Sequence, residues 1–223
     1  MKSFQARLDI LPPAQQYLWP RFSPVNGDFV LYGGTALALR LGHRQSVDFD
    51  FFTHRELEPE KILSALPFLE EATVLQSERN TYTFQVAVAE DFVRISFFGT
   101  VSFGRVQDPE WAHDHVLRVA SEEDLLATKL KVVMQRIETK DYQDIAALLV
   151  AGHSLAAGLG ATQALFGNTF SPVDCLRALE YFEDPLLDDL SRTDRTVLKE
   201  AVQEVVLRGG PVRKMEKTKT LFD

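Results

Sequence analysis

The sequence predicts an α+β protein, with a mixed sheet and its helices in residues 1–120 and a helical region in residues 121–223. Two observations carry this prediction. Short runs of β-forming residues, separated by a Gly-Gly turn and by a hairpin sequence, occupy the first half. From Ser121 onward, apolar residues recur at the spacing of three or four that is typical of amphipathic helices. A chain of 223 residues can form one domain with an appended subdomain.

The first predicted unit is a strand, a tight turn and a helix. Phe29–Tyr32 is a short apolar run that ends at Gly33–Gly34. Thr35 then precedes the helix-forming residues 36–41, and Gly42 suits the C-cap position because glycine adopts a left-handed backbone without strain.

A strand with two different faces follows. Val47, Phe49 and Phe51 alternate with Asp48 and Asp50. Because successive side chains of a strand point to opposite faces, the three apolar residues share one face and the two aspartates share the other. The two carboxylates are therefore expected to point the same way.

The rest of the first half predicts a short helix and a hairpin. Glu60–Leu66 has a helical pattern that Pro67 ends. Thr81–Val88 and Phe92–Phe98 are rich in β-forming residues, and residues 89–91 between them suit a hairpin turn.

The second half predicts a series of helices. The first begins at Ser121, and its apolar stripe consists of Leu126, Leu130, Val133 and Ile137. Lys129 and Arg136 are seven residues apart and are expected on another stripe of that helix. The next helix begins at Asp141, with Asp144 on the same face. Two further helices are predicted, one after Ser171–Pro172 and one around residues 198–205.

The composition excludes several classes of protein. With 24 Lys and Arg against 32 Asp and Glu, the formal charge is -8, so a nucleic acid would have to be met by a local basic patch such as Arg213, Lys214, Lys217 and Lys219. The longest apolar runs are too short for a membrane span, which excludes membrane insertion, and no secretory signal is evident. The single cysteine, Cys175, excludes an internal disulfide and a Cys-built zinc site, and it fits a cytoplasmic protein.

The Asp48–Asp50 pair is the first candidate for chemistry. Carboxylates on the same strand face repel each other unless a cation lies between them, and Mg²⁺ binds through one or two such carboxylates together with substrate phosphate. A solvated strand face is the alternative interpretation. A second alternative is the metal motif of a sugar-nucleotide glycosyltransferase, which does not account for the Gly-Gly turn upstream.

The Gly33–Gly34 turn is the second candidate. Glycines between a strand and a helix let backbone N–H groups approach an anion, and the helix N-terminus adds partial positive charge. A simple tight turn with Thr35 as the cap is the alternative. A phosphate cradle followed by a metal pair, with Arg44 and Ser46 as additional donors between them, indicates metal-assisted phosphoryl transfer.

These motifs resemble a known family. Residues 31–39, 42–44, 46 and 48–52 closely resemble the first motif of the AbiEii/AbiGii-type nucleotidyltransferases, toxin-like members of the DNA polymerase β nucleotidyltransferase superfamily. Residues 124–130, Arg136 and residues 140–144 are similar to the later lysine, arginine and Asp-x-x-Asp helices of that family. Residues 181–184 also resemble its C-terminal region, so the match covers residues 31–184.

The resemblance implies a fold, an activity and a set of roles. The fold is a nucleotidyltransferase-like core, and the activity is transfer of a nucleoside monophosphate from an NTP, with Mg²⁺ or Mn²⁺, to an RNA such as a tRNA end or to a protein side chain. A cognate antitoxin is the implied protein partner. The implied roles are metal binding and catalysis by Asp48 and Asp50 and completion of the catalytic site by Lys129 and Asp141, supported by Arg136 and Asp144. The residues expected to bind the nucleotide are Gly33, Gly34, Thr35, Arg44, Ser46 and Lys129.

One position departs from the superfamily. Members with full polymerase-like chemistry carry a third carboxylate on a later strand, and the position expected for it here is near Ser96. Glu90, Asp91 or Asp108 could substitute for it. The alternative function is therefore a catalytically weak nucleotide-binding module that acts through a protein partner.

Other candidates have structural interpretations. His113–His115 contains two histidines and an aspartate but lacks a further ligand at a useful spacing, so a structural role is expected. Cys175 lacks an evident histidine partner for nucleophilic chemistry. Trp111 and the 16 phenylalanines are expected in the core rather than as base-stacking platforms.

Overall fold

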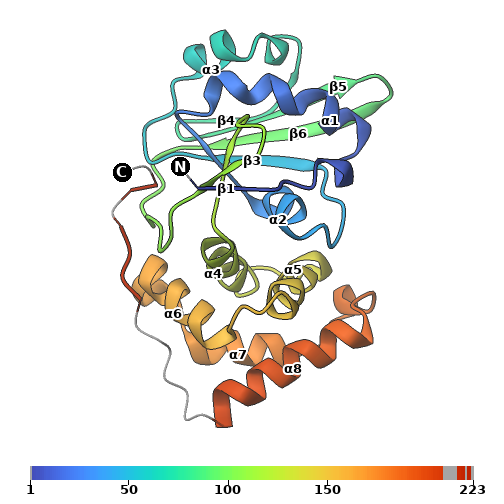
Figure 1. Cartoon of the computed structure of the whole chain (residues 1–223), viewed down its shortest axis with the longest axis vertical. Helices are drawn as coiled ribbons and strands as arrows, with labels where there is room; N and C mark the ends of the chain where they lie inside the picture. Colours follow the sequence, from blue (N-terminus) through green and yellow to red (C-terminus); the bar gives the residue numbers. More distant parts are fainter. Residues whose placement is uncertain (1, 208–214, 219, 222–223) are drawn as a thin grey trace. The chain divides into compact units, whose positions relative to one another are not determined.

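The computed structural model describes residues 2–207, 215–218 and 220–221 and divides them into two compact units. Unit 1 contains the described residues of 1–104, 108–121 and 219–223, and unit 2 contains those of 105–107 and 122–218. The sheet belongs to unit 1, and helices α4 to α8 belong to unit 2 (Figure 1). Arg213, Lys214 and Lys219 of the predicted basic patch lie outside the described residues.

Unit 1 is built on a mixed sheet, as predicted. In the part of the chain that the structure describes, its strands run in the order β1 (Ser3–Phe4), β7 (Glu110–Ala112), β8 (Arg118–Val119), β2 (Val30–Tyr32), β3 (Asp48–Phe52), β6 (Asp91–Phe98), β5 (Thr81–Val88) and β4 (Thr73–Glu78). β3 pairs with β2 in antiparallel and with β6 in parallel orientation. β4, β5 and β6 form consecutive antiparallel pairs.

The predicted strand–turn–helix unit is present. Helix α2 (Gly33–Leu41) begins two residues earlier than predicted, so both glycines lie in its first turn. Gly33 has a positive φ of 77°, which the tight turn after β2 requires, and Gly42 ends the helix with a φ of 65° in the left-handed region.

The aspartate strand has the two predicted faces. Phe49 and Phe51 are fully buried, whereas Asp48 and Asp50 are half-buried on the other face. The prediction for Val47 was wrong, because this residue precedes β3 and is exposed. The strand is therefore one residue shorter at its start than the alternating pattern indicated.

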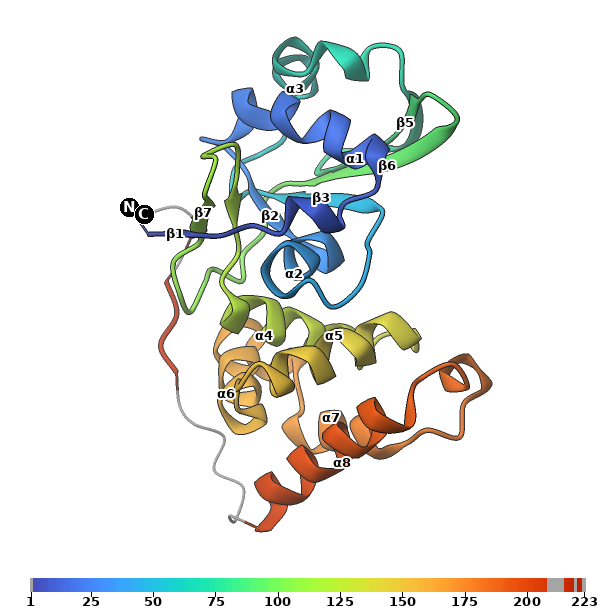
Figure 2. The same cartoon turned by 45° about the vertical axis from the view of Figure 1, so that its right-hand side comes forward.

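The two faces of the sheet have different coverings. Phe22, from the 3₁₀ helix Trp19–Val25, packs on Phe49 and Phe51 with ring centroids 4.8 and 4.9 Å apart. Helices α1 (Pro13–Leu18) and α3 (Pro59–Ala65) lie on this aromatic side, and α2 lies on the opposite side (Figures 1 and 2). The aspartates therefore share their face of the sheet with α2.

The predicted hairpin is also present. β5 and β6 pair in antiparallel register, with Val88 opposite Asp91 and a two-residue turn at Ala89–Glu90. Ala89 has a positive φ of 54°, as hairpin turns of this length require. The predicted short helix before Pro67 corresponds to α3.

Unit 2 is helical, as predicted, but two details differ. Its helices are α4 (Glu122–Val132), α5 (Thr139–Val150), α6 (Leu155–Phe166), α7 (Pro172–Glu180) and α8 (Arg192–Leu207). Val133, Arg136 and Ile137 do not continue α4, because after Val132 the backbone tightens and the Gln135 N–H donates to the Val132 carbonyl at 2.8 Å. Within the described residues no helix is long and apolar enough to cross a membrane.

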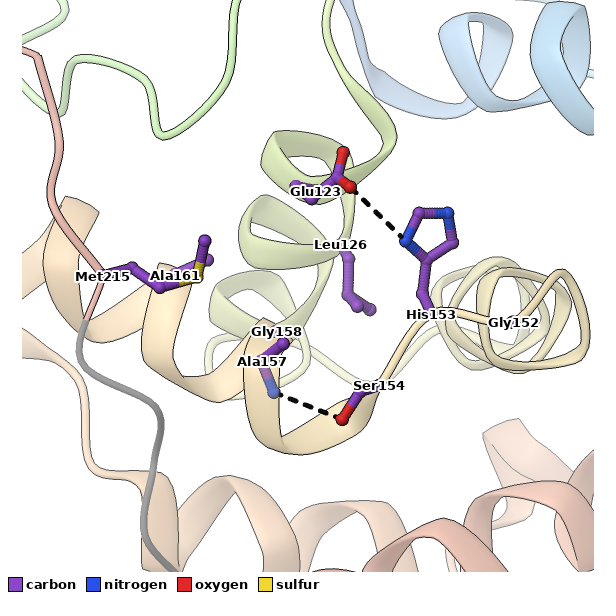
Figure 3. A pocket seen from close by; sticks show the side chains of 9 residues that line it. All are labelled: Glu123, Leu126, Gly152, His153, Ser154, Ala157, Gly158, Ala161 and Met215. Atoms are coloured by element: carbon purple, nitrogen blue, oxygen red, sulfur yellow. Dashed lines mark hydrogen bonds and ion pairs between the residues drawn. The ribbon is translucent and has the colours of Figure 1, made fainter.

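Helix α6 was not predicted, because its glycines lower helix propensity. The structure explains Gly158: a Cβ there would lie 2.6 Å from Leu126 Cδ2, so glycine permits close packing of α6 on α4. Beside this contact, Leu126, Gly158 and Ala161 line a cavity of about 210 Å³, into which Glu123 and His153 also extend (Figure 3).

Candidate functional site

The aspartate face of β3 continues onto β6. In the parallel ladder Asp48 is opposite Arg94 and Asp50 is opposite Ser96, so these four side chains share one face of the sheet. Arg94 Nη2 lies 2.6 Å from Asp48 Oδ2, and the Arg94 side chain is 51% exposed. Arg94 therefore pairs with Asp48, and its positive charge offsets the repulsion between the two carboxylates.

Ser96 occupies the position predicted for the third carboxylate. It is buried beside Asp50, and its Oγ accepts a hydrogen bond from Thr83 Oγ1 at 3.2 Å. Asp91 does not replace it, because Asp91 has the opposite strand parity and lies five residues, about 16 Å, away along β6. No group of three or more His, Cys, Asp or Glu side chains suited to a metal occurs among the described residues.

The glycines at the start of α2 adjoin the same face. A Cβ on Gly33 would lie 2.4 Å from Asp50 Oδ2, and a Cβ on Gly34 would lie 2.7 Å from Arg44 Nη2 and 2.8 Å from Ser46 Oγ. Six predicted site residues are thus brought together in unit 1, namely Gly33, Gly34, Arg44, Ser46, Asp48 and Asp50. The N-cap residue, Tyr32, makes no side-chain cap hydrogen bond, and the first backbone N–H groups of a helix have no partner within the helix, so the start of α2 suits an anion.

Thr35 has a position that differs from that of its neighbours. Its side chain is buried, and its Oγ1 donates to the backbone carbonyl of Asp48. This bond connects the first turn of α2 to the beginning of β3. Thr35 can therefore position Asp48 through this bond. Its side chain is too buried to contact a phosphate directly.

The remaining predicted residues form a buried cluster in unit 2. Lys129 Nζ lies 2.7 Å from Asp141 Oδ1 and 2.6 Å from Asp144 Oδ2, and both aspartates are fully buried. Their spacing of three residues on α5 directs both carboxylates to one face, as predicted. The positive charges of Lys129 and Arg136 compensate the negative charges of the Asp141 and Asp144 carboxylates.

Arg136 reaches this cluster from a loop. It was predicted on the same helix as Lys129, but α4 ends at Val132. The turn that follows places Arg136 Nε 2.9 Å from Asp141 Oδ2, and Nη1 lies 3.2 Å from Glu138 Oε1. The association of Arg136 with the Asp-x-x-Asp helix is therefore correct, although its assignment to the α4 stripe was wrong.

Two weaker candidates have structural roles. His113 Nδ1 accepts from the Ala6 N–H at 3.2 Å, and Asp114 Oδ2 accepts from Trp19 Nε1 at 2.7 Å. Cys175 is fully buried, and burial raises the pKa of its thiol to about 12, so the thiolate needed for nucleophilic chemistry does not form near neutral pH.

Sequence reasoning missed Phe92. The phenylalanines were expected in the core, but Phe92 is 64% exposed. The signal was in the sequence, because the alternation of Val93, Ile95 and Phe97 places Phe92 on the face that carries Arg94 and Ser96.

The fold is that of the nucleotidyltransferases. The chain is similar to a crystal structure from H. pylori, described as a candidate nucleotidyltransferase, with a TM-score of 0.56, 17% identity and coverage of 87% of this chain and 94% of that chain. It is also similar to MenT4, a nucleotidyltransferase toxin from Mycobacterium tuberculosis H37Rv, with a TM-score of 0.50, 14% identity and coverage of 85% and 90%. The α+β nucleotidyltransferase fold is thereby confirmed.

The family follows from the sequence comparison. The model of the nucleotidyl transferase AbiEii toxin family of type IV toxin–antitoxin systems matches residues 18–208, and the chain belongs to this family of enzymes. An uncharacterized protein of Aquifex aeolicus (strain VF5) is 31% identical over 162 residues, which cover 70% of this chain and 75% of that protein. The chain is therefore a toxin-family nucleotidyltransferase, and the predicted family is confirmed.

Proposed function

We propose that this protein transfers a nucleoside monophosphate from an NTP to a hydroxyl group of an RNA, with Mg²⁺ or Mn²⁺ bound by Asp48 and Asp50. The observation that carries this proposal is the geometry of one sheet face. Two carboxylates on β3 adjoin the glycine-rich, uncapped start of α2. This places ligands for a cation beside donors for an anion, which is the combination that an NTP–metal complex requires.

The residues present fit a divalent cation. Asp48 and Asp50 supply hard oxygen ligands on one face, and Gly33 leaves the space beside Asp50 that a Cβ would fill. Arg94 already shows that Asp48 accepts a cationic partner there. A bound Mg²⁺ would supply Lewis-acid stabilisation of the charge that develops on the phosphate oxygens.

The side chains around α2 would bind the nucleotide. The backbone N–H groups of Gly33 and Gly34 are suited to phosphate oxygens, and Arg44 and Ser46 lie against Gly34 as additional donors. Thr35 would act as a positioning residue through its bond to the Asp48 carbonyl. For Lys129 we retain the role that the family resemblance implies, which is contact with a nucleotide phosphate, with Asp141 and Asp144 orienting its ammonium group.

The reaction is an in-line substitution at the α-phosphorus. The acceptor oxygen forms a bond to this phosphorus while the bond to the oxygen that bridges the α- and β-phosphorus breaks. Pyrophosphate leaves with the electron pair, and the acceptor proton passes to solvent. The products are RNA extended by one nucleotide and pyrophosphate.

The partners follow from the family and the proposed chemistry. An NTP is the donor, an RNA such as a tRNA end is the acceptor, and an antitoxin is the cognate protein of a type IV system. Because these RNAs and NTPs are cytoplasmic, we propose the cytoplasm as the place of action. Ser96 favours one alternative, a nucleotide-binding module with little turnover, because serine cannot supply the third carboxylate.

The test uses labelled nucleotides. The protein is incubated with each α-³²P-labelled NTP, Mg²⁺ or Mn²⁺ and total RNA, and labelled RNA is separated from labelled protein. We expect labelled RNA with the wild type and its loss in the Asp48→Asn/Asp50→Asn double variant. Label on protein would reject RNA as the acceptor, and NTP binding without transfer would favour the alternative.

The metal assignment has a separate readout. With nucleotide present, Mg²⁺ or Mn²⁺ should raise the melting temperature of the wild type more than that of the double variant, because a ligand stabilises only a folded state that binds it. Equal increases in the two proteins would reject Asp48 and Asp50 as metal ligands.

A further inference from the structure

Phe92 is a large aromatic side chain on the surface, next to the proposed site. On β6 the buried residues Val93, Ile95 and Phe97 face the core, so Phe92 projects from the opposite face, where Arg94 and Ser96 also lie. Its exposure of 64% means that burial in the core does not account for it.

The neighbours of Phe92 leave its ring accessible. Its partner across the β5–β6 ladder is Ala87, which is small and itself exposed. Two residues further along β6, about 7 Å away, Arg94 is paired across the ladder with Gln85. Arg94 therefore lies next to Asp48 on this face, with the Gln85 amide across the ladder on β5 and the Phe92 ring two residues away along β6.

The charges near Phe92 favour a short contact. Glu90 and Asp91 precede Phe92 in the chain at the hairpin turn, and the whole chain carries a net charge of -8, so this region would not attract an extended polyanion. Stacking of a base on an aromatic ring does not depend on charge, and a single arginine is enough for one phosphate. A duplex keeps its base faces covered, whereas the end of a single strand exposes them.

We infer that Phe92 and Arg94 bind the single-stranded end of the RNA acceptor, with a base stacked on Phe92 and a backbone phosphate on Arg94. A cation bound by Asp48 would compete with Arg94 for that carboxylate and leave the guanidinium group to the phosphate. This inference rests on the proposed function, because it requires the acceptor to end beside Asp48.

The first test measures binding without NTP. Fluorescence anisotropy compares a short single-stranded RNA with a blunt duplex of the same sequence. We expect Phe92→Ala to weaken binding of the single strand by at least about five-fold, Phe92→Trp to retain it, and Phe92→Leu to resemble Phe92→Ala. The control is Tyr17→Ala on α1, since Tyr17 is 53% exposed beneath Arg21 on the other side of the sheet and should have no effect.

The second test measures transfer. With labelled NTP, Phe92→Ala should raise the KM for single-stranded RNA by a similar factor, Phe92→Trp should restore it, and the affinity for NTP should not change. Equal KM values in Phe92→Ala, Phe92→Trp and the wild type would overturn the inference while leaving RNA labelling, and hence the proposed function, intact.

The two proposals fail in different ways. Absence of labelled RNA from the wild type would contradict the proposed function. Equal binding of single strand and duplex by the wild type would overturn the acceptor site whether or not transfer occurs. Label on a protein would replace the RNA acceptor by a protein acceptor and would overturn the inference as well.

Discussion

At the scale of single residues, Gly33 connects backbone geometry to the site. Its φ is positive, and a Cβ would collide with Asp50 Oδ2. We expect Gly33→Ala to lower the free energy of unfolding by about 1–3 kcal/mol and to weaken NTP binding, because backbone strain and displacement of Asp50 add together. Urea unfolding and nucleotide titration measure the two effects.

Two other glycines serve as matched controls for Gly33. Gly152 also has a positive φ, but a Cβ there would meet nothing within 4 Å, so Gly152→Ala isolates the backbone strain. Gly27→Ala would meet neither strain nor contact and should be close to neutral. If Gly33→Ala lowered the free energy of unfolding no more than Gly152→Ala and left NTP binding unchanged, the close approach of Gly33 to Asp50 would contribute neither to stability nor to nucleotide binding.

Ser96 separates the catalytic from the binding interpretation. Ser96→Asp would place a third carboxylate opposite Asp50, at the distance of about 5 Å that separates paired Cβ atoms. In EDTA we expect its melting temperature to fall, because like charges repel in a buried position. With Mg²⁺ or Mn²⁺ we expect a larger increase than in the wild type, since the cation gains a ligand.

The control for Ser96→Asp is Ser96→Asn, which has nearly the same shape without the charge. An equal response of the two variants to metal would show that this position lies outside the metal site.

Residue parity explains how much of this face was predictable. Alternation alone placed Asp48 and Asp50 together, and the register of the structure brings Arg94 and Ser96 to the same face on β6. The same parity also exposes Phe92, yet the apolar character of phenylalanine favoured a core position. Whether a residue near the end of a strand, such as Phe92, is exposed depends on what covers its face of the sheet in three dimensions, which the local sequence does not record.

At the scale of elements, the Lys129 cluster connects α4 to α5. Removing the cation from two buried carboxylates leaves uncompensated charge, so we expect Lys129→Met to lower the free energy of unfolding by about 3 kcal/mol or more. Denaturant unfolding measures this change. Lys140→Met is the control, because Lys140 is exposed and pairs with Glu138 at the surface, where the cost should stay below about 1 kcal/mol.

The result bears on how Lys129 variants are interpreted. If Lys129→Met lost activity only through unfolding, transfer would recover at low temperature, where the folded state is populated. Persistent loss in the folded protein would support the contact with nucleotide phosphate. If Lys129→Met were as stable as the wild type, the ion pairs of Lys129 with Asp141 and Asp144 would not stabilise the contact between α4 and α5.

The helices of unit 2 show where propensity fails as a guide. α7 was predicted at its start, because Ser171 accepts from the Asp174 N–H as an N-cap should. α6 was missed because Gly158 lowers helix propensity, although the same glycine permits α6 to pack on Leu126 of α4. Packing of Gly158 against Leu126 outweighs the low helix propensity of glycine. This contact cannot be predicted from the sequence of α6 alone, because Leu126 belongs to α4.

At the scale of the whole molecule, charge limits how an RNA can bind. A net charge of -8 repels the backbone of RNA, so affinity must come from a few local contacts and from stacking. Composition therefore predicts that the charge of the whole chain does not attract nucleic acid. It could not predict Phe92–Arg94 as a candidate contact, because that pair depends on the fold.

This limit gives a quantitative expectation for salt. Single-stranded nucleic acid releases counterions with a slope of about -0.7 in log K against log salt for each phosphate contact. With one or two contacts we expect a slope between about -0.7 and -1.4, so affinity for single-stranded RNA should fall about three- to seven-fold between about 50 and 200 mM salt. Anisotropy titrations at several salt concentrations measure this slope.

The contribution of Arg94 to that slope can be isolated. Arg94→Gln should reduce the magnitude of the slope by about 0.7, because one phosphate contact is lost, whereas Arg21→Gln, an exposed arginine on the α1 side of the sheet, should leave it unchanged. A much steeper slope that Arg94→Gln does not alter would mean that several other basic residues carry the binding. In that case the predicted basic patch of residues 213–219, rather than β6, would be the principal contact with RNA.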